Sequence, residues 1–209
     1  MDPMQETIKS YNSFADDFTK RYKSRDYTNN LKPCLDKFIS LLKTGEKVLD
    51  IGSGAGFDAK YLFDQGFNVV SIDLADKLID IAREIAPGVD FKIMDMRDMS
   101  FPDNSFGGVW ASASILHLSK KEALKVLQNI KRILKQKGVF FLALKRGVGE
   151  KFTINTEKGN MPGARRFFAY YTKKEVDIIL RNLGFEIEDY SVDNNHENSW
   201  MRFCTVNNK

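Results

Sequence analysis

A short apolar segment ends at an acid and runs into a glycine-rich loop, and this combination of residues could bind a ligand. Asp50 is followed at alternate positions by Gly52, Gly54 and Gly56. Glycine has no Cβ atom, so the backbone of this loop can approach a bound ligand closely. Residues 57–65 have a helical pattern, which puts the loop at the start of a helix. A strand, a glycine loop and a helix in this order predict a site for a nucleotide-type cofactor.

The spacing of the glycines separates two kinds of cofactor. A dinucleotide site requires the pattern Gly-x-Gly-x-x-Gly, but Phe57 stands where the third glycine would fall, so the loop has the pattern Gly-x-Gly-x-Gly. Asp50 is poorly placed for a pyrophosphate and well placed to hold a cationic amino group, directly or through water. The loop therefore favours a zwitterionic ligand over a diphosphate.

A second acid, Asp73, ends the buried strand predicted over residues 68–72. In a βαβ cofactor fold, an acid at the tip of the second strand accepts hydrogen bonds from the two ribose hydroxyls. The competing interpretation is an N-cap for the following helix, a role for which Asp76 is better placed. We therefore expect Asp73 to bind the cofactor.

A third acid, Asp95, follows the strand predicted over residues 90–94. Adenine must be held at its edge, by an acceptor for the exocyclic amine and a backbone donor for a ring nitrogen. An acid followed by an apolar residue supplies both, so we assign Asp95 to the adenine amine and Met96 to the ring. The alternative is that the two residues simply end a strand.

A fourth strand is predicted from Phe106 through Trp110, and the small residues after it border the glycine loop. In a doubly wound sheet the first and fourth strands flank the crevice where ligands bind. His117 follows this strand. Its unperturbed pKa lies near neutrality, so one interpretation is a general base. The other is a structural histidine that orients the loop, and the sequence leaves both open.

Residues 48–56 read VLDIGSGAG, which resembles the first motif of the class I S-adenosylmethionine-dependent methyltransferases, in particular the small-molecule type similar to methyltransferase domain 11 or 25. The likeness covers residues 47–144. It departs from the family at Gly107, where an acid is usual, and at His117, which stands alone where the family has two histidines. The resemblance implies in-line transfer of a methyl group from S-adenosylmethionine to a small-molecule acceptor, with S-adenosylhomocysteine as the product.

The patterns and the resemblance together give two sets of expected site residues. Those for the cofactor are Asp50, Gly52, Ser53, Gly54, Gly56, Asp73, Leu74, Asp95, Met96, Ala111 and Tyr22. Those for the methyl acceptor are Tyr11, His117, Arg165, Arg166 and Tyr170. Because the sulfonium already activates the methyl group, the main tasks of the protein are alignment and exclusion of water. A catalytic base is therefore optional, and His117 is the candidate for it.

The segments outside this core are expected to cover it. Residues 6–23 are predicted to form one amphipathic helix, which the resemblance implies closes over the cofactor; the alternative is a helix that merely packs on the core. A second helix is predicted over residues 33–42, introduced by its proline. Residues 145–171 are predicted to be a long loop, and such loops are usually functional or mobile.

Arg165 and Arg166 stand beside four aromatic residues at the end of that loop. Guanidinium groups pair bidentately with carboxylate or phosphate, so the pair predicts an acceptor that is anionic and partly apolar. The alternative is ordinary surface charge beside a hydrophobic strand.

The order of predicted elements indicates an α/β fold. The resemblance implies a Rossmann-like, doubly wound, mostly parallel sheet of seven strands with an antiparallel last strand. Capping boxes at Ser119 and Thr172 begin two later helices. We expect one domain, in which residues 1–44 are an N-terminal helical lid, 45–144 the cofactor-binding core, and 145–209 the substrate loop and a C-terminal hairpin.

The composition narrows the partners and the compartment. The 32 Lys and Arg against 28 Asp and Glu give a net charge of +4 without long runs of one sign, which does not indicate nucleic acid. Cys34 and Cys204 lie far apart and predict neither a disulfide nor a metal site. The sequence has no apolar run of about 18 residues and no signal-peptide pattern, so we expect a cytoplasmic protein with no membrane partner. We expect it to be a monomer or a homodimer.

Two other functions stay open. A nicotinamide-dependent oxidoreductase is disfavoured by Phe57 and by the acid at Asp50. A cofactor-binding protein that no longer catalyses, and serves in regulation or assembly, is compatible with the same motifs.

Overall fold

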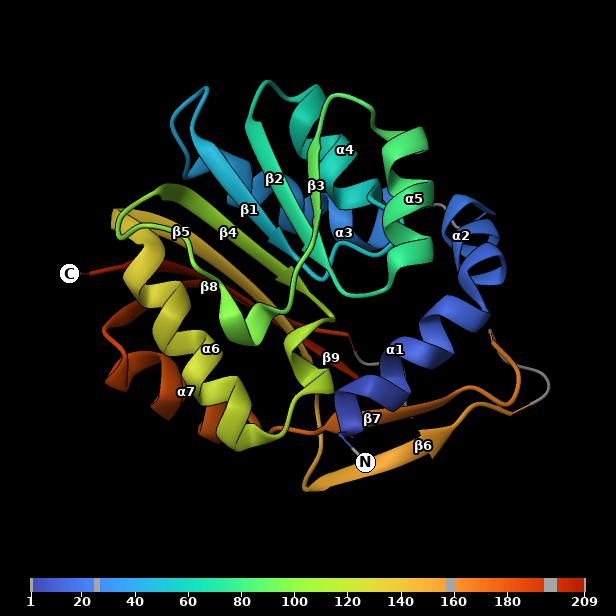
Figure 1. The fold of residues 1–209 in the computed structure, drawn as a ribbon. Coiled ribbons are helices and arrows are strands. Elements are labelled where there is room, and N and C mark those ends of the chain that lie inside the picture. Colours follow the sequence, from blue (N-terminus) through green and yellow to red (C-terminus); the bar gives the residue numbers. More distant parts are fainter. Residues whose placement is uncertain (1, 25–26, 157–160, 194–198, 209) are drawn as a thin grey trace.

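The computed structural model of the chain describes residues 2–24, 27–156, 161–193 and 199–208. Within them, a seven-stranded sheet has the order β3-β2-β1-β4-β5-β9-β8 (Figure 1). Its strands are β1 (Lys47–Ile51), β2 (Asn68–Asp73), β3 (Asp90–Ile93), β4 (Phe106–Ser112), β5 (Leu134–Lys145), β8 (Phe185–Val192) and β9 (Trp200–Asn207). Only β9 runs against its neighbours in this sheet, because it pairs antiparallel with both β5 and β8. The predicted doubly wound fold with an inserted antiparallel last strand is confirmed.

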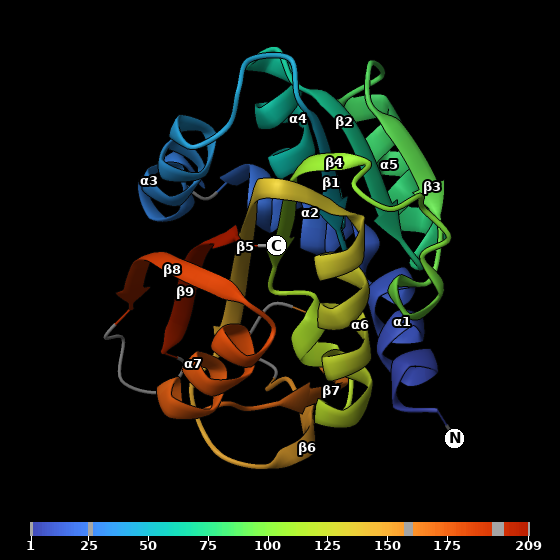
Figure 2. The ribbon, with the colours of Figure 1, turned by 90° about the vertical axis from the view of Figure 1, so that its left-hand side faces the viewer.

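Helices pack on both faces of the sheet (Figure 2). One face is covered by α3 (Tyr27–Ser40), α4 (Phe57–Asp64) and α5 (Asp76–Ile85). The other is covered by α6 (Lys120–Ile133) and α7 (Lys173–Asn182). Both predicted capping boxes are present: Ser119 and Glu122 begin α6, and Thr172 and Glu175 begin α7.

The core between β4 and the helix α3 contains a stack of large aromatic side chains. The Trp110 ring lies on the Phe141 ring with centroids 3.7 Å apart, and the edge of Phe38 meets Trp110 at 5.3 Å. All three side chains are fully buried. Well-packed aromatic pairs of this kind fix side chains in one position. The stack thus holds β4 against β5 and the helix α3.

The prediction of one helix over residues 6–23 is wrong. Two helices occur instead, α1 (Pro3–Ser13) and α2 (Ala15–Ser24), and the chain bends at Phe14, where φ is −121° and ψ is 26°. Asn12, just before the bend, is a weak helix former whose side chain hydrogen-bonds to Asp76 and to the backbone N–H of Lys77. These contacts to α5 compete with continuation of a single helix.

The helix predicted over residues 33–42 begins earlier. α3 starts at Tyr27, and Pro33 lies inside it. A proline is favoured in the first turn of a helix because its missing N–H is not needed there, which is why the prediction placed the start of the helix at Pro33.

The segment 145–171 is not a long loop. It contains β6 (Glu150–Ile154) and β7 (Arg165–Ala169), which pair antiparallel with Phe152 opposite Phe167. Residues 157–160, where the predicted loop carried Gly159, lie outside the described part of the chain. The hairpin went unrecognised because its strands are short, charged and separated by a long connection.

The β6–β7 hairpin packs against α1, as Figure 1 shows. The Thr7 hydroxyl accepts a hydrogen bond from the Phe167 backbone N–H at 3.0 Å, and the Ser10 hydroxyl donates one to the Arg165 carbonyl at 2.7 Å. The hairpin and the N-terminal helix are therefore joined along one edge. In the described ranges, no helix has both the length and the apolar character needed to cross a membrane.

Candidate functional site

A cleft lies at the carboxyl ends of β1, β2 and β4, between the glycine loop and the helices α1 and α2. It encloses about 990 Å³ of space outside the protein atoms, including the part open to solvent. The predicted cofactor residues that line it are Asp50, Gly52, Ser53, Gly54, Asp73, Leu74, Met96 and Tyr22, and the predicted acceptor residues that line it are Tyr11 and His117. Most of the site residues predicted from the sequence therefore lie around one cleft.

The glycine loop can exist only without side chains at two of its positions. Gly52 has a φ of +72°, and a Cβ atom there would lie 2.3 Å from the Cβ of Ser114. Gly56 has a φ of +78°, and its Cβ would lie 2.9 Å from the Cβ of Ala82. Gly56 does not line the cleft. Its missing side chain lets the glycine loop pack closely on α5.

Every Asp, Glu, Lys or Arg among the described residues that line the cleft is an aspartate: Asp50, Asp58 and Asp73. Asp50 is only 2 % exposed, and its Oδ2 atom has no hydrogen-bond partner in the described part of the protein. Burial, and then the negative charge of Asp73, raise the pKa of Asp50 to about 8. A bound cation would favour the ionised form again. Among the described residues that line the cleft there is no lysine or arginine, so the cleft suits a ligand that carries positive charge.

Sequence reasoning missed a second buried acid, Asp58, which also lines the cleft. It lies in the first turn of α4 and is 9 % exposed. Its Oδ2 accepts a hydrogen bond from the Trp110 indole at 2.7 Å. The available signal was an acid just after the glycine loop, at the start of a helix.

Asp73 joins the glycine loop to the start of α5. Its Oδ2 accepts from the Gly54 N–H and its Oδ1 from the Ala75 N–H, both at 2.8 Å. Burial raises the pKa of Asp73, while these backbone hydrogen bonds oppose the rise. Each carboxylate oxygen can accept a further hydrogen bond. The expectation that Asp76 caps α5 is wrong, because Ala75 is the N-cap residue and Asp76 accepts from the Asn12 side chain instead.

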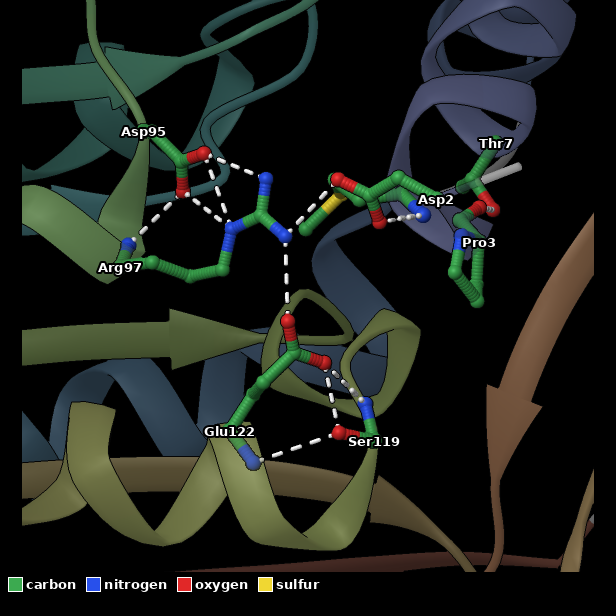
Figure 3. A network of polar contacts seen from close by, with 8 residues as sticks. Asp2, Pro3, Thr7, Asp95, Arg97, Ser119 and Glu122 are labelled. Carbon is green, nitrogen blue, oxygen red and sulfur yellow. Dashed lines mark hydrogen bonds and ion pairs between the residues drawn. The ribbon is translucent and has the colours of Figure 1, made fainter.

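Asp95 is held by an arginine that the sequence analysis did not single out (Figure 3). Arg97 donates to Asp95 Oδ2 through Nη2 at 2.7 Å and through Nε at 2.9 Å. Its Nη1 atom pairs with Asp2, at the start of α1, and with Glu122, at the start of α6. The acids, with Asp95 foremost, raise the pKa of Arg97. Asp95 itself does not line the cleft, whereas Met96 does.

Beside the cleft, Arg166, Tyr11 and His117 form a chain of hydrogen bonds. Tyr11 and His117 line the cleft, whereas Arg166 does not. His117 Nδ1 lies 2.7 Å from the Phe167 carbonyl oxygen, so this nitrogen carries the proton and Nε2 is an acceptor. The Tyr11 hydroxyl donates to His117 Nε2 at 2.9 Å and accepts from Arg166 Nη1 at 3.0 Å. Burial lowers the pKa of His117 to about 3 and raises that of Tyr11. Both groups are therefore neutral at pH 7.

The two adjacent arginines point in different directions. Successive side chains of a strand alternate between its faces, and both residues lie in β7. Arg165 pairs with Glu6 at 2.6 Å and lies over the Phe152 ring, away from the cleft lining. Arg166 contacts Tyr11. Tyr170, which packs beside Phe168, does not line the cleft, and neither does Ala111.

We predict that His117 stays neutral with its proton on Nδ1 down to about pH 5. Its folded pKa of about 3 lies below the unfolded value, so its contribution to stability is complete above pH 6.5 and is lost as the pH falls toward 3. Nitrogen-15 NMR of the imidazole across this range measures the effect, with a His196→Gln variant to assign the signals. A titration midpoint near 6.5 would contradict the hydrogen-bond assignment.

Comparison with known protein families gives a match over residues 49–142, to the family described as "Methyltransferase domain". Phosphoethanolamine N-methyltransferase 1 of Arabidopsis thaliana is 40 % identical over 88 residues, which are 40 % of this chain and 18 % of that protein. Phosphoethanolamine N-methyltransferase 2 of Caenorhabditis elegans is 31 % identical over 166 residues, 76 % of this chain and 36 % of that protein. The chain therefore spans well under half the length of either relative.

Solved structures share the fold across nearly the whole chain. The 1,6-didemethyltoxoflavin-N1-methyltransferase of Burkholderia thailandensis, solved with 1,6-didemethyltoxoflavin and S-adenosylhomocysteine, has a TM-score of 0.76 at 18 % identity and covers 100 % of this chain and 92 % of its own. The PH0226 protein of Pyrococcus horikoshii OT3 has a TM-score of 0.73 at 27 % identity, with 94 % and 95 % covered. The predicted resemblance is confirmed: the chain has the class I methyltransferase fold, and its residues 49–142 match the methyltransferase domain family.

Proposed function

We propose that the protein is an S-adenosylmethionine-dependent methyltransferase that acts on a small molecule. The observation that carries the proposal is the acid-lined cleft at the glycine loop, where Asp50 holds a buried oxygen without a partner among the described residues. When bound, the cofactor supplies a methyl group activated by a sulfonium, and its amino group is a second cation. A cleft with acids and no lining lysine or arginine among its described residues suits both charges.

The residues of the cleft divide the cofactor between them. Asp73 lies at the tip of β2. Each of its carboxylate oxygens accepts one backbone hydrogen bond and can accept a second one from a ribose hydroxyl. Asp50 takes the cationic amino group. Met96 contributes an apolar wall for the adenine. We keep Asp95 as the proposed partner of the adenine amine, from a position beside the cleft lining where Arg97 holds its carboxylate.

On the acceptor side, His117 acts best as a positioning residue. Its Nε2 is already engaged by the Tyr11 hydroxyl, and a pKa of about 3 makes it a weak base at pH 7. Tyr11, which lines the cleft, is held in one orientation by His117 and Arg166. Its hydroxyl is the group that meets the nucleophile of the acceptor and aligns it for in-line transfer.

We further propose that the acceptor carries an anionic group, which extends past Tyr11 to Arg166, outside the cleft lining, and does not reach Arg165. Arg166 Nε is buried without a hydrogen-bond partner in the described ranges, and its guanidinium lies 5.4 Å from the Tyr11 ring and 5.1 Å from the Phe168 ring. Burial, and the charge of Arg166, lower the pKa of Lys145 to about 8, so positive charge is concentrated there. Several relatives are named for phosphoethanolamine, a phosphate-bearing acceptor.

The arrangement of the chain extends this proposal. Residues 1–44 act as a lid over the cofactor-binding core of residues 45–144, and residues 145–209 supply the acceptor side and the C-terminal hairpin. We also propose that the protein works in the cytoplasm, as a monomer or homodimer, without a nucleic-acid partner. A cofactor-binding protein that does not catalyse would retain the cleft but not the need for a positioned Tyr11, so the Tyr11–His117–Arg166 chain favours the enzyme.

Asp73→Ala should weaken binding of S-adenosylhomocysteine by about 1.5 to 3 kcal/mol for each charged hydrogen bond lost to ribose. Isothermal titration calorimetry measures the loss. Asp80→Asn is the matched control, because Asp80 is an exposed acid of α5 that pairs with Arg83 outside the cleft. Equal affinities for wild type and Asp73→Ala would show that Asp73 does not bind the cofactor.

Arg166→Met should raise the KM for an anionic acceptor at least about tenfold and leave the affinity for S-adenosylhomocysteine nearly unchanged, since a charge-assisted hydrogen bond is lost only on the acceptor side. Arg165→Met is the control, because it changes the neighbouring guanidinium, which pairs with Glu6. Initial rates with phosphoethanolamine as the first acceptor tested give both constants. Equal effects of the two substitutions on KM would refute the assignment.

A further inference from the structure

The buried acid Asp58 has a role that the fold alone does not explain. It lies in the first turn of α4 and lines the cleft, and it is 9 % exposed. Its Oδ2 accepts the indole N–H of Trp110 at 2.7 Å. Its Oδ1 is buried and has no hydrogen-bond partner in the described residues. Half of this carboxylate is therefore satisfied and half is not.

A structural role would not require the negative charge. Holding the Trp110 indole needs one acceptor oxygen, which an asparagine amide supplies equally well. Burying a carboxylate with an unpaired oxygen is unfavourable, and here burial raises the pKa of Asp58 to about 6. The start of α4 and the indole N–H favour the charged form only partly. The charge points to a ligand that donates hydrogen bonds to Oδ1.

The position of Trp110 connects Asp58 with Asp50. Trp110 pairs in register with Asp50 across β4 and β1, and its indole bonds to Asp58. Trp110 cannot shift, since it is fully buried against Phe141. The cleft thus receives two buried acids from the same side of the sheet, and each has one oxygen without a partner in the described part of the chain.

The chemistry of the cofactor narrows the group that Asp58 meets. The sulfonium has no N–H or O–H and so cannot satisfy Oδ1. The ribose hydroxyls belong to Asp73 at the tip of β2. The ammonium of the amino-acid end has three N–H donors and a positive charge. Resting on the proposed function, we propose that Asp58 is a second cofactor-binding carboxylate, which contacts the ammonium group of the cofactor together with or in place of Asp50.

Two ligands that differ only at the amino-acid end test this assignment. S-adenosylhomocysteine has the ammonium, whereas 5′-methylthioadenosine has the same thionucleoside without it. Calorimetry measures the binding of both ligands to wild type and to Asp58→Asn. Relative to wild type, the substitution should raise the dissociation constant of S-adenosylhomocysteine about tenfold and change that of 5′-methylthioadenosine less than about twofold. The substituted amide is isosteric with the carboxylate and keeps an acceptor for Trp110. Asp64→Asn, which alters an exposed acid of the same helix, should change neither constant.

Other results would overturn the inference. An equal loss for both ligands would mean that Asp58 only supports the shape of the cleft, and no loss for either would mean that it is not a ligand. Wild-type protein that binds neither ligand would refute the proposed function and this inference with it. If Asp58→Asn does not fold, as judged by its melting transition, Asp58→Ser is the second variant and should show the same selective loss.

Discussion

The site depends on acids that the fold removes from water at the carboxyl ends of its central strands. Asp50 is 2 % exposed and keeps an oxygen without a partner in the described residues, and its pKa rises to about 8. Such a group destabilises the protein unless something positive meets it. Asp50 pairs in register with Trp110 across β1 and β4, and Trp110 stacks on Phe141 of β5, so Asp50 lies in the packed centre of the sheet. A bound cation would offset the free energy that burial of Asp50 costs.

The N-terminal helices complete the site through contacts with segments far away in the sequence. Asp2 pairs with Arg97, Glu6 with Arg165, and the Tyr11 hydroxyl with His117. α1 is thus attached to the core on one side and to the β6–β7 hairpin on the other. The cleft is therefore walled by three separate parts of the chain: the helices α1 and α2, the glycine loop with its neighbouring strand ends, and the segment around His117.

The sequence predicted those parts of the site that depend on local patterns. The glycine loop, Asp73 and Met96 follow strand ends, and their order along the chain determines their position in a doubly wound sheet. The contacts of Tyr11 with His117 and Arg166 depend on long-range pairing, which periodicity does not encode. Arg166 meets Tyr11 and Arg165 turns away because β7 alternates its faces, and this follows only once the hairpin is known. The bend at Phe14 likewise results from contacts between Asn12 and α5.

We infer that the acidic cleft selects a zwitterionic sulfonium cofactor and its product over a dinucleotide. The most direct test is calorimetric titration of the wild-type protein with S-adenosylhomocysteine and with NADH under the same conditions. Asp50 and the third glycine position, occupied by Phe57, predict binding of S-adenosylhomocysteine with a stoichiometry of about one and no heat of binding for NADH. Tight binding of NADH, with S-adenosylhomocysteine inert, would contradict the account.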